Sequence, residues 1–153
     1  MEGLDRRLVS LLAADGRMSF TDLGKATGLS TSAVHQRVRR LEERGVIRGY
    51  RAVVDLEEVG LPLTAFISLL PLDPAAPDDV PDRLKAVPEI EACYSVAGDF
   101  SYGAMVRVAT PVKLEDLIAR IRAAANVQTR TTVVLSTPWE GRPVITPDDK
   151  PDQ

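Results

Sequence analysis

The chain has 153 residues, of which 44% are hydrophobic and 27% are charged, and its formal net charge is −3. These values are ordinary for a soluble globular protein, and no run of about 18 apolar residues indicates a membrane span. The single cysteine, Cys93, excludes an intramolecular disulfide and a metal site built from a cysteine cluster. Charged residues interrupt every apolar run near the N-terminus, so no signal peptide is indicated and a cytoplasmic protein is expected.

Charge is distributed unevenly along the chain. Residues 1–51 hold ten Lys or Arg against six Asp or Glu, a net charge of +4. Residues 52–153 hold nine against sixteen, a net charge of −7. This asymmetry indicates a nucleic-acid-binding half joined to a half with a different task.

Three helices are predicted in the N-terminal part. The first carries leucines at the spacing of one helical face and ends near Gly16. The second begins after Ser19, a favourable N-cap residue, and ends at Gly28, a favourable residue just past a helix end. The third begins after Ser30 and runs to about Arg44.

The second and third helices have the pattern of a helix-turn-helix, in which a turn of three to four residues joins two helices. Gly28 lies at the turn and apolar Leu29 follows it, while Ala26 supplies a small residue on the second helix. Val34 and Val38 are expected to face inward from the third helix. Few unrelated helical proteins meet all of these conditions in register.

The segment VIRGYRAVVD follows the third helix. Its β-branched residues predict a short strand, a turn at Gly49 and a longer strand over Tyr50–Val54. These strands would form the wing of a winged helix-turn-helix domain and the first part of a linker.

The sequence from Leu61 onward predicts a second kind of domain. An apolar strand (LTAFISLLPL) is followed by a helix (DVPDRLKAVPEI), a hairpin of two strands around Gly98-Asp99, an amphipathic helix (PVKLEDLIARIRAAANV) and a last strand (QTRTTVVLST). The order β-α-β-β-α-β is that of the ferredoxin-like split βαβ unit. The predicted fold class is α+β, with a helix-turn-helix domain, a strand and hinge linker, a ferredoxin-like domain and a C-terminal tail over residues 1–49, 50–62, 63–138 and 139–153. The last eight residues are polar and rich in proline, and they are expected to be disordered.

The third helix presents a polar side away from its buried side. At 100° per residue, Ser32, Gln36 and Arg39 lie opposite the buried face, flanked by His35 and Arg40. Arginine suits guanine in the major groove, glutamine suits adenine, and serine or histidine suits bases or phosphates. In an isolated helix such charges would more commonly be a solvated face, but a helix-turn-helix in a net positive half favours DNA contact.

Other charged residues of this helix have different predicted roles. Arg37 lies about 60° from the centre of the buried face, so we expect it to run along the helix packing and pair with Asp5 or Asp15. Glu42 and Glu43 are expected to pair with an arginine, Arg39 or Arg40, at helical spacing. Arginines near and beyond the helix end fit phosphate contacts. The predicted DNA-contacting residues are Ser30, Thr31, Ser32, His35, Gln36, Arg39, Arg40, Arg44 and Arg48.

The sequence resembles the Lrp/AsnC family of feast/famine transcriptional regulators over essentially residues 4–137. The segment LDRRLVSLLAADGRMSFTDLGKATGLSTSAVHQRVRRLEERGVIRGY resembles the family's DNA-binding domain almost throughout. The segment GDFSYGAMVRV resembles the family's Gly-Asp-Tyr-Asp-Tyr turn and strand in its ligand-sensing, ferredoxin-like domain. Two motifs in the right order and at the right separation make this resemblance specific.

The resemblance implies a transcription factor that binds double-stranded DNA, dimerises through its C-terminal sheets and often assembles into octamers. It also implies an amino acid or related small effector at the interface between dimers, which shifts assembly or DNA affinity. The implied effector-binding residues are Gly98, Asp99, Phe100, Ser101 and Tyr102. Here Phe100 replaces the usual Tyr, Ser101 the usual Asp and Gly103 a usual aliphatic residue, while Asp99 remains to hold a ligand ammonium. The alternative is that Gly98-Asp99 is only a hairpin turn, since both residues are favoured there for backbone reasons.

Two other functions compete with this interpretation. An architectural, nucleoid-type DNA-binding protein without an effector would share every DNA-binding feature. An enzyme would need a nucleophile–base pair or a metal set, but the C-terminal half has no histidine and one cysteine, and its acids are scattered. Cys93 is expected to be a small core or interface residue, and the lone His35 does not indicate a metal site. We therefore predict no enzyme activity, no metal, no cofactor and no membrane partner, and a regulator located with the nucleoid in the cytoplasm.

Overall fold

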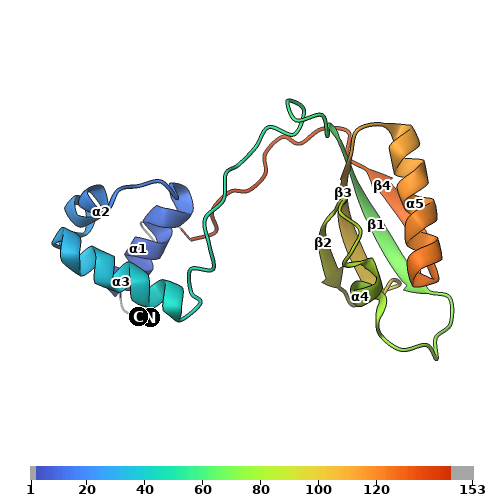
Figure 1. Cartoon of the computed structure of the whole chain (residues 1–153), viewed down its shortest axis with the longest axis horizontal. Coiled ribbons are helices and arrows are strands. Elements are labelled where there is room, and N and C mark those ends of the chain that lie inside the picture. Colours follow the sequence, from blue (N-terminus) through green and yellow to red (C-terminus); the bar gives the residue numbers. More distant parts are fainter. Residues whose placement is uncertain (1–2, 146–153) are drawn as a thin grey trace. The chain divides into compact units, whose positions relative to one another are not determined.

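The computed structural model describes residues 3–145 and divides them into two compact units (Figure 1). One unit comprises residues 3–53 together with residues 139–145, and the other comprises residues 54–138. The predicted tail therefore groups, as far as it is described, with the N-terminal helices. The last eight residues, predicted to be disordered, lie outside the described residues. Over residues 3–145, no helix is both long enough and apolar enough to cross a bilayer.

Three helices form the N-terminal unit, as the sequence predicts: α1 (Gly3–Ala14), α2 (Phe20–Thr27) and α3 (Thr31–Glu43). Each of the last two begins at a serine cap. The Oγ of Ser19 accepts a hydrogen bond from a backbone N–H in the first turn of α2, and Ser30 does the same for α3. These caps satisfy N–H groups that have no partner inside the helix.

The three helices enclose one small apolar core. Its fully or almost fully buried members are Leu8, Leu12, Leu23, Val34, Val38 and Leu41. Val34 and Val38 face inward as predicted, and they leave the opposite side of α3 to solvent. Burying a side chain of this size stabilises a fold by about 1.5–3 kcal/mol, so six of them are a large share of what holds a three-helix unit together.

The turn between α2 and α3 depends on two glycines. Gly28 ends α2 with φ +75°, in the left-handed region that glycine adopts without strain. Gly24 lies on α2 where the chain returns toward α3: a Cβ placed there would be 2.7 Å from the carbonyl oxygen of Leu29. The small residue that this close approach requires is therefore Gly24, while Ala26, which the sequence indicated, is only half-buried.

The predicted wing is wrong. Residues 48–55 form no strand in the described structure, and Val53 is completely exposed, at 102% of its reference surface. β-branched residues favour extended backbone, but an extended segment becomes a strand only when a neighbour accepts its hydrogen bonds. Nothing in the described chain provides that neighbour. The N-terminal unit is thus a helix-turn-helix without a wing, and the linker is extended chain rather than a strand.

The second unit has the predicted β-α-β-β-α-β order. Its elements are β1 (Leu63–Pro71), α4 (Val80–Leu84), β2 (Ile90–Ser95), β3 (Tyr102–Val108), α5 (Pro111–Ala125) and β4 (Val127–Val133). The strands lie in the order β2-β3-β1-β4 and every neighbouring pair is antiparallel. This confirms the ferredoxin-like fold.

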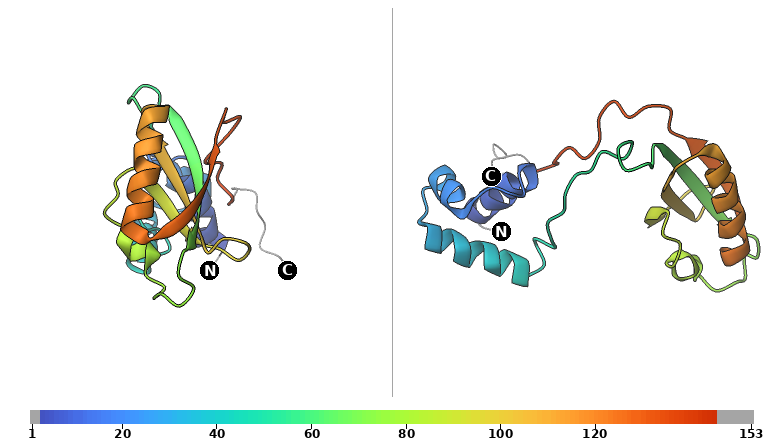
Figure 2. Two further views of the ribbon diagram at one scale, coloured as in Figure 1. Left: turned by 90° about the vertical axis from the view of Figure 1, so that its right-hand side faces the viewer. Right: turned by 45° about the horizontal axis from the view of Figure 1, so that its top comes forward.

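Both helices cover the same face of this sheet, as the edge-on view in Figure 2 shows. The covered face supplies the core, with Ala65, Ile67 and Leu69 of β1 buried against α5 residues such as Leu117 and Ile121. Side chains alternate between the two faces of a strand. The other face therefore carries the intervening residues, including Phe66, which is 49% exposed.

The close approach at Gly24 yields a prediction. Overpacking of this kind destabilises by about 1–3 kcal/mol, although alanine otherwise favours a helix over glycine by about 1 kcal/mol. We expect Gly24→Ala to lower the free energy of opening of α2 and α3 by about 1 kcal/mol, measured by amide hydrogen exchange. Gly3→Ala, which meets no atom within 4 Å, is the control and should leave it unchanged. A Gly24→Ala protein as stable as the wild type would contradict the close approach.

Candidate nucleic-acid interface and small-molecule cavity

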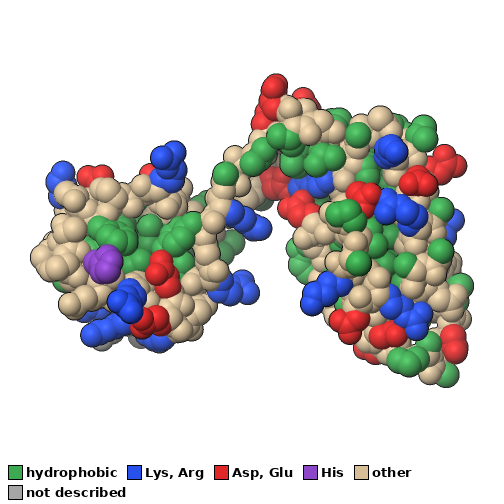
Figure 3. All heavy atoms as spheres, in the orientation of Figure 1, with side chains coloured by type: hydrophobic (Ala, Val, Ile, Leu, Met, Phe, Trp, Pro, Cys, Tyr) green, Lys and Arg blue, Asp and Glu red, His purple; other side chains and the backbone are tan. Residues whose placement is uncertain are grey.

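The polar side of α3 is assembled as the sequence predicts. Ser32, His35, Gln36, Arg39 and Arg40 are all exposed, on the side opposite to the buried valines. Figure 3 shows the histidine at the surface of the N-terminal unit, beside hydrophobic side chains and next to basic ones. At the start of the helix, Ser30 and Thr31 are also exposed, and the Oγ atoms of Ser30 and Ser32 are 3.2 Å apart.

The two arginines of this face differ in their contacts. Arg39 donates to Glu43 one turn further on, with 2.9 Å between Nε and Oε1, as predicted for one of the two glutamates. Both side chains are largely exposed, so the pair contributes little to stability and is readily exchanged for another anion. Arg40 has no side-chain partner among residues 3–145. Both guanidinium groups are therefore available to an external anion.

Arg37 behaves as its position on the helix predicts. Its Nη1 atom lies 2.8 Å from Oδ1 of Asp5 on α1, and both side chains are mostly buried. This hydrogen-bonded ion pair joins α3 to α1 in a partly desolvated setting, where removing one partner leaves the other charge uncompensated. Arg37 therefore holds α3 in place rather than contributing to its exposed face.

His35 is oriented by an aromatic neighbour. The ring of Phe20, the first residue of α2, meets the imidazole edge-to-face, with 5.3 Å between centroids and 77° between planes. Such a contact is favourable beyond the area that it buries. It fixes the imidazole beside Gln36 and Arg39 on the exposed face of α3.

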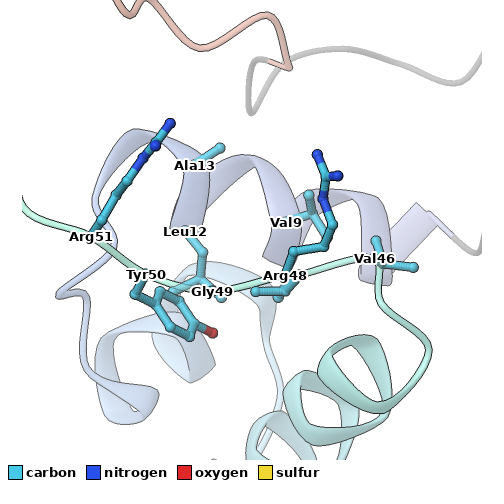
Figure 4. Close-up of a pocket in the computed structure, with 9 residues that line it drawn as sticks. Val9, Leu12, Ala13, Val46, Arg48, Gly49, Tyr50 and Arg51 are labelled. Atoms are coloured by element: carbon cyan, nitrogen blue, oxygen red, sulfur yellow. The ribbon is translucent and has the colours of Figure 1, made fainter. Parts of the chain in front are cut away.

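The two arginines beyond α3 are placed differently from each other. Arg44 is the C-cap residue of α3 and is exposed. Arg48 lies on the segment 46–51, which borders a groove of about 500 Å³ along α1 with an apolar floor that includes Val9 and Leu12. Figure 4 shows Arg48 and Arg51 extending to the same side, away from the end of α3. The structure therefore does not bring Arg48 together with the face of α3.

The predicted pairing of Glu42 with Arg39 or Arg40 is wrong. Glu42 accepts a hydrogen bond of 2.9 Å from the phenol of Tyr50, not one from an arginine. Burial, followed by the hydrogen bond and the charge of Glu42, raises the pKa of Tyr50 from 10.0 to about 12. This contact ties the segment that carries Arg48 to the last turn of α3.

The second unit contains a cavity at the predicted effector turn. The cavity, of about 360 Å³, lies where the connection between β2 and β3 meets the uncovered face of β1 and β4. Gly98, Asp99 and Phe100 line it, as expected for effector-binding residues. Tyr102 instead points into the core, at 3% exposure, and Ser101 does not line the cavity. The backbone N–H of Ser101 donates to the carbonyl of Leu69, which fastens the turn to β1.

Five further lining residues were not predicted: Val96 and Ala97 just before the turn, Ser68 on β1, and Arg130 and Thr132 on β4. Ser68 and Arg130 are paired in the sheet register. They are separated from the turn by about thirty residues of sequence on either side, so only the strand order brings them to it. The one local signal that Arg130 and Thr132 share a face was their spacing of two residues in a predicted strand.

The uncovered face of the sheet also contains a buried charge. Arg107 on β3 is 9% exposed, donates to Glu91 at 2.7 Å and also contacts the hydroxyl of Thr64. Exposed aromatic side chains, Phe66 and Tyr94, lie on the neighbouring strands of this face. Aromatic and arginine side chains are enriched at protein interfaces, so these residues mark the uncovered face as a candidate interface.

Cys93 is not a core residue. It is exposed on β2, which is an edge strand, so of the two predicted roles the core role is wrong and the interface role stays a prediction. Desolvation by its surroundings nonetheless raises the pKa of its thiol, which lowers the thiolate fraction and hence the reactivity at neutral pH. Over the described part of the chain, no group of three or more His, Cys, Asp or Glu side chains is arranged to hold a metal ion.

Comparisons with known proteins bear on both units. Residues 1–42 match the model of the AsnC-type helix-turn-helix domain, and residues 64–144 match that of the Lrp/AsnC ligand binding domain. The chain is 53% identical over 142 residues to the HTH-type transcriptional regulator LrpA of Mycobacterium tuberculosis, covering 93% of this chain and 95% of that protein. It is 33% identical over 140 residues to the leucine-responsive regulatory protein of Escherichia coli, covering 88% and 85%.

Solved structures agree with these matches. The feast or famine regulatory protein from M. tuberculosis complexed with L-methionine is 54% identical, with a TM-score of 0.91 over 93% of this chain and 97% of that chain. A structure of the M. tuberculosis leucine response regulatory protein is 52% identical, with a TM-score of 0.87 over 95% and 99%.

The bond between Tyr50 and Glu42 predicts a specific pH dependence. Because folding stabilises the protonated phenol, its contribution to stability is complete below pH 10 and is lost as the pH rises toward 12. The difference in tyrosinate absorbance between the wild type and Tyr50→Phe should be one phenol that titrates near pH 12, since the buried Tyr102 is common to both proteins. A difference that titrates near pH 10 instead would show that the contact does not form in solution.

Proposed function

The chain belongs to the Lrp/AsnC family of transcriptional regulators, and from this premise we propose that it binds specific DNA sequences and responds to an amino acid or a related small effector. The family membership makes it a regulator with a helix-turn-helix and a ligand-binding domain, rather than an enzyme. DNA binding is supported chiefly by the exposed polar face of α3. The ion pair between Arg37 and Asp5 fixes this helix to α1. Such a regulator acts at the nucleoid in the cytoplasm.

In this proposal α3 enters the major groove. Arg39, Arg40 and Gln36 reach base edges, since arginine and glutamine can each make paired hydrogen bonds to a purine. The hydroxyls of Ser30, Thr31 and Ser32, at the helix start, contact phosphates together with the positive end of the helix. Arg44 adds a phosphate contact at the helix end. Arg48 extends away from the exposed face of α3. Its phosphate contact therefore requires DNA that reaches beyond that face.

The regulator acts as a homodimer that pairs through the uncovered faces of its sheets, and dimers assemble further, up to an octamer. The exposed rings of Phe66 and Tyr94 supply apolar surface that a second copy would cover. A symmetric dimer presents two copies of α3, which fit two half-sites about 34 Å apart and favour a palindromic DNA site.

The effector binds in the cavity at the β2–β3 turn and biases how dimers associate. A relative that is 54% identical is described as complexed with L-methionine, which supports an amino acid as the ligand class. Because DNA affinity rises with the number of recognition helices engaged at once, a change in assembly alters DNA binding without touching α3.

An effector-independent architectural protein is the second candidate. It is favoured by one observation: Ser101 stands where the family pattern has an aspartate, so the turn retains one carboxylate, that of Asp99. Binding of randomised and selected DNA with equal affinity, unaffected by any amino acid, would favour it.

Arg40 provides the test of the DNA-binding face. Loss of a paired contact to a base weakens specific binding by about 1–3 kcal/mol, so Arg40→Met should lower the affinity for DNA selected from a randomised library by about 5- to 150-fold. If Arg40 instead contacts phosphate, the slope of log affinity against log salt should fall by about 0.9. Fluorescence anisotropy at several salt concentrations measures both quantities.

Arg83→Met is the matched control for Arg40→Met, because it removes the same charge from α4, where Arg83 pairs with Asp79 at the surface. It should bind DNA as the wild type does. An Arg40→Met protein with wild-type affinity and salt slope would exclude this face as the DNA-binding surface.

Phe66 provides the test of assembly. A carboxylate at the centre of a buried apolar interface loses several kcal/mol of hydration, so Phe66→Asp should convert dimers to monomers in sedimentation equilibrium. A monomer presents one copy of α3 instead of two, so it should bind DNA at least about tenfold more weakly. Val112→Asp, which places the same charge on an exposed valine of α5, should change neither. Dimers that persist in Phe66→Asp place the dimer interface elsewhere.

A further inference from the structure

The groove on the N-terminal unit has an apolar floor that the proposed function does not use. It lies between the C-terminal half of α1 and the segment 46–51, and its volume of about 500 Å³ is within the range of small-molecule sites (Figure 4). Its apolar lining comes from both sides: Val9, Leu12, Ala13, Val46, Ile47 and the ring of Tyr50. Such a floor gains free energy when an apolar ligand displaces water from it.

Two arginines, Arg48 and Arg51, border this groove and extend to the same side (Figure 4). Positions three residues apart on a regular extended chain point to opposite sides. Gly49, between them, has φ +154°, a conformation that side chains rarely adopt and that glycine adopts without strain. The backbone at this glycine thus departs from the regular alternation, and both guanidinium groups are directed to one side of the groove.

The charges of the two arginines are not compensated by the chain. Both residues are exposed, and neither side chain has a hydrogen-bond or ion-pair partner among residues 3–145. Within the same range, no acidic residue lines the groove. The groove therefore combines an apolar floor with two positive charges that are available to an external anion.

Hydrogen bonds hold both ends of the segment that borders the groove. The backbone N–H groups of Val46 and Ile47 donate to the carbonyl of Leu41 at 2.9 and 3.1 Å. The phenol of Tyr50 donates to Glu42 at 2.9 Å. The segment is thus fastened to the end of α3 before any ligand arrives. A site that is formed in advance loses less conformational entropy on binding, which favours affinity.

We propose that this groove binds a small amphipathic acid, whose apolar chain or ring covers the floor and whose carboxylate binds Arg48 and Arg51. A guanidinium binds a carboxylate through charge-assisted, paired hydrogen bonds. DNA fits the groove less well, because its phosphate backbone has no apolar chain to cover the floor. The inference goes beyond the proposed function, since the groove belongs to the N-terminal unit and the proposed effector cavity to the second unit.

Arg48 links this groove to DNA binding. A carboxylate bound at Arg48 neutralises a charge that the proposed function assigns to a phosphate contact. The acid should therefore weaken DNA binding and lower the slope of log affinity against log salt by about 0.9. This consequence rests on the proposed function, whereas binding of the acid does not.

Isothermal titration calorimetry of the full chain tests the site, with octanoate as the probe. Octan-1-ol has the same chain without the carboxylate, and acetate has the carboxylate without the chain. Octanoate should bind the wild type at least about tenfold more tightly than either compound, because it alone uses both the floor and the arginines.

The double variant Arg48→Met/Arg51→Met tests the arginines. It should bind octanoate at least about tenfold more weakly than the wild type does and bind octan-1-ol equally well, since the alcohol makes no charged contact. Arg40→Met/Arg44→Met, which removes two exposed charges of the same unit from outside the groove, is the matched control. It should leave both affinities unchanged.

A pair of neighbouring alanines tests the floor. Ala13 and Ala14 are both exposed at the end of α1, and only Ala13 lines the groove. Ala13→Asp places a carboxylate on the floor, where it interrupts the apolar surface and competes for the arginines, so octanoate should bind at least about tenfold more weakly. Ala14→Asp should bind octanoate as the wild type does.

The inference is overturned if octanoate does not bind the wild type, or binds it no more tightly than octan-1-ol. It is also overturned if Arg130→Met abolishes octanoate binding and Arg48→Met/Arg51→Met does not, because the acid then occupies the cavity of the second unit. Calorimetry without DNA gives these results whether or not the proposed function holds. DNA affinity in octanoate and in acetate at equal ionic strength tests the consequence, and equal affinities in the two salts would show that the acid does not act on DNA binding.

Discussion

The burial of one face of α3 is the constraint on which the N-terminal unit depends. Val34, Val38 and Leu41 are almost completely removed from solvent, and any rotation of the helix would exchange them for charged or amide side chains. Burying an unpaired guanidinium loses several kcal/mol of hydration, far more than the unit could supply. The orientation of the helix is therefore determined by its apolar residues, and the polar ones are presented outward as a consequence.

Two contacts refine that orientation. The ion pair between Arg37 and Asp5 joins the flank of α3 to α1, and the phenol of Tyr50 is bonded to Glu42 in the last turn. Arg37 and Glu42, the charged residues of α3 in these two contacts, thus have a structural role. Arg39 and Arg40 remain available to DNA. An acidic protein can bind DNA in this way, because only the charges on one face of one helix need to approach the phosphates.

In the second unit, too, the burial of one apolar face determines which side chains remain exposed. Its two helices cover one face of a four-stranded sheet, and the alternation of side chains leaves Phe66 and Tyr94 on the other. In the proposed function, a second copy of the chain covers this face. At the end of the same face, the β2–β3 turn borders the cavity with Asp99 and Arg130. The proposed assembly and the proposed ligand binding would thus share one side of one sheet.

Local patterns in the sequence predicted most of the elements and the exposed face of α3, because capping serines and helical periodicity act within a few residues. A helical angle predicted that Arg37 pairs with an acid, Asp5 or Asp15, and the structure selects Asp5. The strand over Tyr50–Val54 was predicted wrongly, since propensity does not reveal whether a pairing partner exists. Gly24 and Ala26 are both small, and only the path of the turn shows which one meets Leu29. Arg130 was missed because strand order, rather than sequence proximity, brings it to Asp99.

One measurement tests the central claim, that an amino acid acting on the second unit controls sequence-specific DNA binding by the first. DNA selected from a randomised library is titrated with the wild-type chain beside a scrambled duplex of equal length, with and without a mixture of apolar amino acids. The account predicts specific binding at least about a thousandfold tighter than binding to the scrambled duplex, and an affinity that shifts at least about fivefold when the amino acids are present. Equal affinity for both duplexes, unchanged by the amino acids, would contradict the account and indicate an architectural DNA-binding protein.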